Sequence, residues 1–403
     1  MEKKMSKIVF FCIPAQGHTN PTLGVVRELV SRGHEVYYYS YNMLRERIEE
    51  AGAKFVSCDE YDMEQKLSPA DGERIGKDMA FSIKVLVDTT LALDEKIKED
   101  MELLKPDCIV ADSMAVWGKA AALKYGIPFV SSTTTFAFNK ESAKIMKHGG
   151  TGFFELLRAL PKMRRDVKRL QEKGYPIKSF LDIIANNENT ETIVYTSPEF
   201  QPCAETFSDK YSFVGPSIMP CTQEIEKTKE NLIYISMGTV NNDMMPLYGR
   251  FIEAFADTPY QMILSAGDVV RLSDFGQLPA NISVYRRVDQ IAVLSKADVF
   301  FSHCGMNSVS ESLYFGVPIA MLPQTSEQLG VARRTAELGA GILLENTEVR
   351  TIRHAAEKLM AEPSYKKNAE KISEGFHRCG GASAAADKIL KVCGKGEKIQ
   401  EKK

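Results

Sequence analysis

A short segment near residue 300 carries side chains that suit the binding of a diphosphate. The apolar run at 299–301 is followed by a polar turn and then by a helical pattern. A strand that passes through a glycine turn into a helix presents unpaired N–H groups and the positive end of the helix dipole to an anion. His303 and Gly305 fall in the turn, and Asn307 and Ser308 in the first helical turn. Together they could surround a pyrophosphate.

Glu311 extends this pattern toward the group that the phosphates carry. It lies four residues after Asn307, so both side chains share one helix face. Helical side chains lean toward the N-terminus, which directs this carboxylate at a ribose and its two hydroxyls. Each residue also has a structural explanation, with Asn307 and Ser308 as capping residues and Glu311 as a partner of the helix dipole. Their occurrence in one register favours a binding site.

Glu327 and Gln328 follow the next apolar run, in the segment PQTSEQ. A carboxylate and an amide at the carboxyl end of a strand are suited to holding sugar hydroxyls. Thr325 and Gln328 also match a capping box, which gives Gln328 a structural role instead. The position beside the phosphate site favours the binding role.

His18 and Asp112 are the candidates for acid–base chemistry. His18 follows the first apolar run in the sequence AQGHTNP, where Asn20 and Pro21 have the pattern of N-cap and N1 and would leave His18 on a loop. Asp112 ends the apolar run at 108–111, whereas Asp107 begins it and is the weaker candidate. An aspartate can orient an imidazole and stabilise it once protonated. A histidine bonded only to its own loop is the alternative.

Alternating apolar runs and helical patterns predict the elements that position these residues. This alternation is typical of β-α-β units around parallel sheets. We expect strands near 7–13, 34–40, 53–57, 107–111, 127–131 and 192–196, and again near 231–236, 260–265, 281–285, 297–302, 317–322 and 341–344. The sequence therefore predicts an α/β fold with two doubly wound, Rossmann-like domains facing each other across a cleft.

Length and local composition suggest where the domains divide. A chain of 403 residues is too long for one ordinary core. Prolines and a charged run predict a linker at 216–230 between domains at 1–215 and 231–380. Residues 381–403 would form a helix and a charged tail that could pack back on the first domain. The segments near 60–100 and 133–180 are longer than a minimal crossover needs. An apolar acceptor pocket could be lined by Phe81, Met114, Trp117, Phe136, Phe138, Phe153 and Phe154, with membership of an ordinary core as the alternative.

Composition narrows the partners and the compartment. The net charge of -2 gives no reason to expect nucleic acid or an anionic membrane. The eight cysteines lack C-x-x-C and zinc spacing, which favours reduced core thiols. No apolar stretch approaches the roughly 20 residues that span a bilayer. We therefore expect a cytoplasmic protein without stable membrane insertion; no signal indicates an oligomeric state.

The segments HCGMNSVSESLYFGVP and LPQTSEQ closely resemble the donor signature of family-1 UDP-glycosyltransferases, in particular the bacterial macrolide-glycosyltransferase group. The resemblance continues through IPAQGHTNPTLGVVREL, ETFSDKYSFVGPS and ISMGT, and so covers nearly the whole chain. It implies the two-domain GT-B fold, with the acceptor in the first domain and a UDP-sugar in the second. It is specific for the fold and the donor and says little about the acceptor.

The resemblance also implies a role for each matching residue. His303 would contact the β-phosphate, Asn307 and Ser308 the phosphate oxygens, and Glu311 the ribose. The remaining donor residues would be Glu327 and Gln328 on the hexose, Gly238 and Thr239 beside the pyrophosphate, and the stretch Arg287, Val288, Asp289 and Gln290 at the uracil. That stretch departs from the family pattern, because Asp289 stands where a proline is usual. His18 and Asp112 match the pair that deprotonates the acceptor.

The expected reaction is an inverting transfer of a hexose, glucose by preference, to a hydroxyl of a small, largely apolar acceptor such as a flavonoid or a macrolide. The sequence contains no D-x-D metal motif, so the helix dipole, backbone amides and His303 would stabilise the leaving diphosphate without a metal or other cofactor. A UDP-sugar epimerase and a non-catalytic protein that binds nucleotide sugars are the alternatives.

Overall fold

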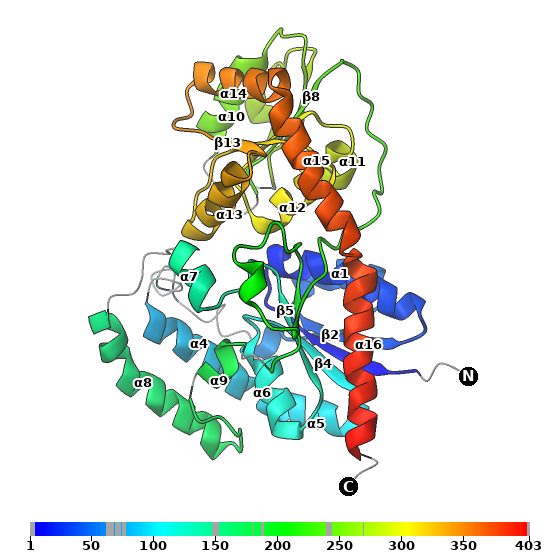
Figure 1. The fold of residues 1–403 in the computed structure, drawn as a ribbon, viewed down its shortest axis with the longest axis vertical. Helices are drawn as coiled ribbons and strands as arrows, with labels where there is room; N and C mark the ends of the chain where they lie inside the picture. Colours follow the sequence, from blue (N-terminus) through cyan, green and yellow to red (C-terminus); the bar gives the residue numbers. More distant parts are fainter. Residues whose placement is uncertain are drawn as a thin grey trace. The chain divides into compact units, whose positions relative to one another are not determined.

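The computed structural model describes residues 5–61, 68, 74, 78–146, 153–179, 181–186, 189–238, 244–268 and 270–400. The chain forms two compact units. Unit 1 comprises residues 1–195, 203–217 and 380–403, and unit 2 comprises residues 196–202 and 218–379. Each unit is a parallel sheet covered by helices (Figure 1). The predicted pair of Rossmann-like domains is confirmed.

Unit 1 contains a seven-stranded sheet in the order β3-β2-β1-β4-β5-β6-β7. All its strand pairs are parallel. The strands are β1 (Lys7–Phe11), β2 (Glu35–Ser40), β3 (Lys54–Ser57), β4 (Cys108–Asp112), β5 (Phe129–Thr133), β6 (Thr192–Val194) and β7 (Tyr211–Phe213). Its helices are α1 (Gln16–Ser31), α2 (Arg45–Glu50), α4 (Met79–Ala92), α5 (Asp94–Leu104), α6 (Val116–Tyr125), α7 (Lys140–Met146), α8 (Phe153–Glu172), α9 (Leu181–Ile184) and α16 (Gly381–Gln400).

Unit 2 contains a six-stranded parallel sheet in the order β10-β9-β8-β11-β12-β13. The strands are β8 (Leu232–Ser236), β9 (Gln261–Ser265), β10 (Ile282–Tyr285), β11 (Val299–Ser302), β12 (Ile319–Met321) and β13 (Gly341–Leu343). The helices are α10 (Met245–Phe255), α11 (Gln290–Leu294), α12 (Met306–Tyr314), α13 (Ser326–Glu337), α14 (Val349–Ala361) and α15 (Pro363–Arg378). Short 3-10 turns occur at Asn42–Leu44, Asp59–Tyr61, Ala204–Thr206 and Leu272–Phe275.

The strands are nearly continuous apolar runs because both faces of each sheet are buried. In unit 1, alternate residues such as Val9 and Phe11 join one core, which also contains Trp117 of α6. Phe10 points to the other face, where its ring stacks on Tyr38 with centroids 5.6 Å apart. This apolar patterning explains why all twelve predicted strands are found.

Three parts of the fold were not expected. Strand β7 has only three half-buried residues and lies at the sheet edge, so it lacks an apolar run. Residues 196–202 belong to unit 2, where the Arg334 guanidinium donates to the backbone oxygens of Glu199 and Phe200. Residues 218–230, within the segment predicted as a linker, also belong to unit 2.

Helix α16 belongs to unit 1 and lies beside α1 and β4 (Figure 1). Its apolar face buries Ile389 and Val392. Arg32 at the end of α1 donates to the Ser383 hydroxyl at 2.7 Å and to the Asp387 carboxylate at 2.5 Å. The last helix of the sequence therefore completes the first unit.

Both sheets have a topological switch point, which is where open α/β sheets bind ligands at the carboxyl ends of their strands. In unit 1 the strand order reverses between β1 and β4, and in unit 2 it reverses between β8 and β11. The predicted residues follow these four strands: His18 after β1, Asp112 at the end of β4, Gly238 after β8 and His303 after β11. The fold thus places each predicted cluster at a switch point.

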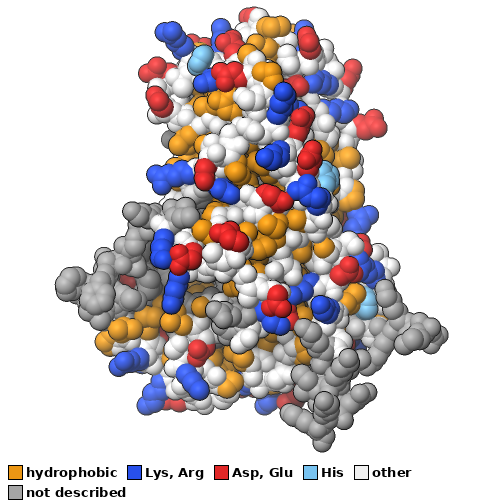
Figure 2. Space-filling view, in the orientation of Figure 1, with side chains coloured by type: hydrophobic (Ala, Val, Ile, Leu, Met, Phe, Trp, Pro, Cys, Tyr) orange, Lys and Arg blue, Asp and Glu red, His pale blue; other side chains and the backbone are white. Residues whose placement is uncertain are grey.

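The surface carries charges of both signs. On the face shown in Figure 2, lysine and arginine side chains alternate with aspartate and glutamate rather than gathering in one field. Within the described ranges, no helix is both long enough and apolar enough to cross a bilayer.

Candidate active site

His18 lies in the first turn of α1, and the predicted loop position is wrong. The helix begins at Gln16, and the N–H groups of His18 and Thr19 both donate to Ala15 O at 3.0 Å. Pro21 is inside the helix, where it removes only the bond to the Gly17 carbonyl. A proline this close to a helix start is tolerated, so the pattern Asn20-Pro21 misplaced the start by five residues.

The His18 imidazole is in direct contact with Asp112. The distance from Nδ1 to Oδ2 is 2.7 Å. The Asp112 side chain is completely buried, and the His18 side chain is 21% exposed. The other carboxylate oxygen, Oδ1, accepts from the backbone N–H of Met114 at 2.8 Å, which fixes the carboxylate plane. The structure thus brings together two residues that are 94 positions apart.

Thr134 is a third member of this cluster that the sequence did not reveal. Its hydroxyl lies 3.1 Å from His18 Nδ1. It directly follows β5, the neighbour of β4, so it reaches the same sheet edge as Asp112. Its position directly after a predicted strand could have indicated a site residue, but threonine is too common at such positions to be informative.

This arrangement selects one tautomer of the neutral imidazole. When Nδ1–H donates to Asp112, the lone pair of the ring is on Nε2, which can accept a proton. The buried carboxylate then stabilises the imidazolium that forms. The pKa of the nearby Cys12 thiol is raised, mainly by burial and in addition by the negative charge of Asp112. The pair can act as a general base.

In unit 2, the turn after β11 is shaped by backbone conformations that few residues adopt. Cys304 has a φ of 68°, and Gly238 after β8 has a φ of 78°. A Cβ atom on Gly238 or on Gly305 would lie 2.8 Å from His303 Nε2. Position 238 therefore requires glycine, whereas a Cβ on Gly305 would displace the imidazole, which lies between the two backbone segments. Thr239, predicted beside the pyrophosphate, lies outside the described residues.

Helix α12 begins at this turn with Gly305 as its N-cap residue. Glycine has no side-chain oxygen to accept from the first N–H groups, whereas Asp289 caps α11 and Thr325 caps α13. Asn307 and Ser308 are in the first turn of α12 and are partly exposed. An anion is the partner that such a helix start favours.

His303 is held in its neutral form. Burial lowers the pKa of its imidazole below the usual 6.5, and the backbone of Ser236 acts in the opposite direction. A neutral imidazole can still donate one hydrogen bond to a phosphate oxygen. It also gains a proton more readily once a diphosphate brings negative charge beside it.

Gln290, Ser308 and Glu311 form a connected group. Gln290 Nε2 donates to Glu311 Oε2 at 2.5 Å and to Ser308 Oγ at 3.3 Å. Tyr234 of β8 donates from its hydroxyl to Gln290 Oε1 at 3.2 Å. Tyr234 was not predicted, because an aromatic residue in a buried strand gives no sign of a polar role.

The other residues of the predicted uracil stretch differ in exposure and in their contacts. The Arg287 side chain is 68% exposed and pairs with Asp268. Val288 is partly buried. Gln290 hydrogen-bonds to Glu311. Asp289 Oδ2 instead accepts from the Thr222 N–H at 2.5 Å and from the Thr222 hydroxyl at 2.9 Å. The aspartate that departs from the family pattern thus has a structural role.

The capping-box explanation for Gln328 is confirmed. Thr325 Oγ1 accepts from Gln328 N at 3.3 Å, and Gln328 Oε1 accepts from Thr325 N at 3.2 Å and from Gln324 N at 2.8 Å. The amide oxygen is therefore occupied, and only the NH₂ group can serve a sugar. Glu327 is exposed in the same helical turn.

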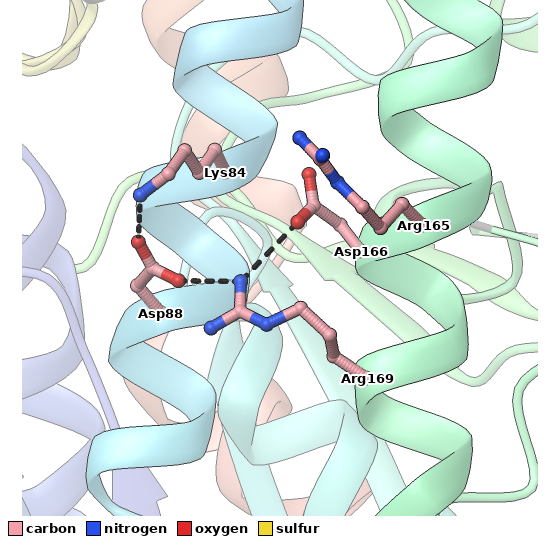
Figure 3. Close-up of a pocket in the computed structure, with 5 residues that line it drawn as sticks. All are labelled: Lys84, Asp88, Arg165, Asp166 and Arg169. Carbon is pink, nitrogen blue, oxygen red and sulfur yellow. Dashed lines mark hydrogen bonds and ion pairs between the residues drawn. The ribbon is translucent and has the colours of Figure 1, made fainter.

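A hollow of about 520 Å³ lies between α4 and α8, away from all predicted site residues (Figure 3). Arg169 of α8 bridges Asp88 of α4 at 2.7 Å and Asp166 at 3.2 Å, and Lys84 pairs with Asp88. Because carboxylates already compensate these cations, the cluster fastens α8 to α4.

The candidates for an acceptor pocket divide into buried and exposed residues. Trp117 and Phe136 are buried and belong to the core, whereas Met114 and Phe138 are each 47% exposed. Phe81 is partly buried. The side chains of Phe153 and Phe154 lie outside the described residues.

Comparisons with known proteins agree with this geometry. Residues 218–379 match the family model for UDP-glucoronosyl and UDP-glucosyl transferase. The NDP-glycosyltransferase YjiC of Bacillus licheniformis is 33% identical, with 95% of this chain and 96% of the relative covered. The uncharacterized UDP-glucosyltransferase YojK of Bacillus subtilis is 31% identical, with 96% and 98% covered.

A solved structure extends the comparison to the fold. The glycotransferase of kitacinnamycin superimposes with a TM-score of 0.83 at 26% identity, covering 96% of this chain and 99% of the other. The similarity covers both units, so the whole chain can be assigned to one family. The chain is a GT-B glycosyltransferase and belongs to the UDP-glucoronosyl and UDP-glucosyl transferase family.

Proposed function

We propose that the protein transfers a hexose, by preference glucose, from a UDP-sugar to a hydroxyl of a small apolar natural product, with inversion at the anomeric carbon. The observation that carries this proposal is the 2.7 Å contact between His18 Nδ1 and the buried carboxylate of Asp112. It provides an oriented base at the switch point of unit 1.

The donor would bind to unit 2. Its diphosphate would lie on the N–H groups at the start of α12, between Gly238 and His303, with Asn307 and Ser308 as side-chain donors. Glu311 would accept from the ribose hydroxyls, and the backbone of Arg287 and Val288 would border the uracil. A UDP-sugar is further supported by the names of the matching family and of the relative from Bacillus subtilis.

The hexose would be held by Glu327 and the Gln328 amide. Both lie in the first turn of α13, which follows β12, the neighbour of β11. This order places them at the same sheet edge as the phosphate turn.

Transfer would be one in-line displacement. His18 Nε2 removes the proton from the acceptor hydroxyl while that oxygen forms a bond to the anomeric carbon and the bond to the UDP oxygen breaks. A single displacement converts an α-linked donor into a β-glycoside. The departing diphosphate gains its negative charge beside the α12 dipole and His303, so we propose that no metal is required.

The acceptor would be a small apolar natural product. The solved relative described above is the glycotransferase of kitacinnamycin, which supports a natural product as the acceptor. Met114 and Phe138 are exposed apolar side chains near the ends of β4 and β5 and could contact such a molecule.

The direct test combines transfer with binding. Purified protein is incubated with UDP-glucose and a panel of flavonoids, macrolides and sterols, with and without EDTA, and products are identified by mass spectrometry. The anomeric configuration is read from the coupling constant of the anomeric proton. We expect β-glucosides whose yield EDTA does not change.

The variant His18→Ala separates the catalytic proposal from a binding protein without activity. Loss of the base should reduce transfer by about 10²–10⁴-fold and leave the Kd for UDP unchanged. The matched control is His354→Ala, at an exposed position on α14. Wild-type transfer by His18→Ala, or an EDTA-induced loss restored by Mg²⁺ or Mn²⁺, would contradict the mechanism.

A further inference from the structure

Tyr234 is a buried tyrosine whose hydroxyl has a specific partner. Its ring stacks on Phe300 of the adjacent strand β11, with centroids 5.0 Å apart and planes 11° from parallel. The residue is 1% exposed. Its hydroxyl donates to Gln290 Oε1 at 3.2 Å and also hydrogen-bonds the side chains of Ser236 and Ser265. The ring is thus fixed by the sheet, and the hydroxyl reaches the first residue of α11.

This contact sets the orientation of the Gln290 amide. With Oε1 toward the Tyr234 hydroxyl, the NH₂ group faces Glu311 Oε2 at 2.5 Å and Ser308 Oγ at 3.3 Å. The reverse orientation would place the amide oxygen against a carboxylate oxygen, which repel each other. The hydrogen bonds therefore form a chain in which Tyr234 of β8 donates to Gln290 of α11, and Gln290 donates to Glu311 of α12.

We propose that Tyr234 is a positioning residue for the donor nucleotide: its hydroxyl fixes the Gln290 amide, and the amide fixes the Glu311 carboxylate where the ribose hydroxyls bind. This inference rests on the proposed function, in which Glu311 accepts from the ribose. Tyr234 does not itself touch the donor.

Removal of the hydroxyl has a defined consequence. In Tyr234→Phe the ring keeps its stacking on Phe300, but Gln290 Oε1 loses a donor in a partly buried place. The amide is then held at its NH₂ end only, by Glu311 and Ser308, and positions the carboxylate less firmly. Loss of one such bond is expected to weaken UDP binding about threefold to tenfold.

The ribose 2′-hydroxyl provides a readout that a general structural effect would not change. The Kd values of UDP and 2′-deoxy-UDP are measured by calorimetry for the wild type, Tyr234→Phe and Glu311→Gln. If Tyr234 acts through Glu311, the preference for UDP over 2′-deoxy-UDP falls in Tyr234→Phe, in the same direction as in Glu311→Gln.

Tyr248→Phe is the matched control. Tyr248 is also buried in unit 2, and its hydroxyl donates to the Ala266 carbonyl at 3.3 Å. We expect this variant to keep the wild-type preference between the two nucleotides.

Two results would overturn the inference. One is an equal loss of affinity for both nucleotides in Tyr234→Phe, and the other is no loss for either. A wild-type protein that binds neither nucleotide would overturn both this inference and the proposed donor. Tight UDP binding without transfer to any acceptor would count against the proposed reaction alone, because the nucleotide preference is measured without turnover.

Discussion

His18 and His303 are the same residue type in two environments that suit two tasks. The His18 imidazole is partly exposed and contacts a buried carboxylate, which favours the gain of a proton. The His303 imidazole lies between two glycine segments, and burial lowers its pKa below 6.5. In the proposed reaction, the first ring accepts a proton, and the second remains neutral until a diphosphate binds.

The environment of His303 predicts a pH dependence of stability. Because its pKa is lower in the folded protein than in the unfolded chain, the unfolded chain binds more protons between the two values. The free energy of unfolding should therefore rise with pH through this window and fall as the pH drops below about 6.5. His303→Gln should lose stability less steeply than the wild type between about pH 7.5 and about pH 5.5.

Thermal unfolding at several pH values checks this expectation. His354→Gln removes an exposed histidine from the same unit and should keep the wild-type slope. Identical slopes for His303→Gln and the wild type would show that the imidazole is not responsible.

At the scale of elements, helix α11 depends on one side chain at its start. Asp289 Oδ1 accepts from the N–H groups of Ile291 and Ala292 at 3.0 and 3.1 Å, while Oδ2 accepts from Thr222. Although burial acts in the other direction, these hydrogen bonds lower the pKa of Asp289. One carboxylate thus caps the helix that carries Gln290 and anchors the chain segment that enters unit 2.

Substitutions at Asp289 should separate these two contributions. Asp289→Ala removes both and should lower the free energy of unfolding of unit 2 by about 1–2 kcal/mol. Asp289→Asn keeps an oxygen for the helix cap but places an amide NH₂ against the Thr222 N–H, so its loss should be intermediate. Denaturant unfolding measures the order. Equal losses for the two variants would show that the helix cap contributes nothing, and a wild-type stability of Asp289→Asn would show that the Thr222 contact contributes nothing.

The elements differ in how well the sequence predicts them. Buried parallel strands are apolar runs, so their positions are local information, and the residues that directly follow them are assigned to the correct sheet edge. The start of α1 was misplaced because a proline inside the first turns resembles one at a helix start. Thr134, Tyr234 and the second role of Asp289 depend on contacts between distant segments, which no local pattern encodes.

At the scale of the whole molecule, the chain passes between the units four times. The boundaries follow Tyr195, Pro202, Ser217 and Cys379. Helix α16 then closes unit 1 with buried residues that include Ala385, Ile389 and Val392. The stability of the first unit therefore depends on the last helix of the sequence.

Ile389→Ala tests this dependence. A cavity against α1 and β4 should reduce the free energy of unfolding of unit 1 by about 2–5 kcal/mol. The unfolding transition of unit 2, which is recognised because UDP stabilises it, should not change. Lys391→Ala, at an exposed position on the same helix, is the control and should remain within about 0.5 kcal/mol of the wild type. A shift of the UDP-sensitive transition alone would contradict the assignment of α16.

The position of α16 also has a consequence for synthesis on the ribosome. The segments of unit 2 have all been translated by residue 379, whereas unit 1 still lacks the helix that covers part of α1 and β4. At about 5–20 residues per second, roughly 8–33 seconds separate residue 217 from residue 380. The usual order of maturation is thereby reversed: the amino-terminal unit cannot complete its fold until the carboxyl-terminal unit has been made.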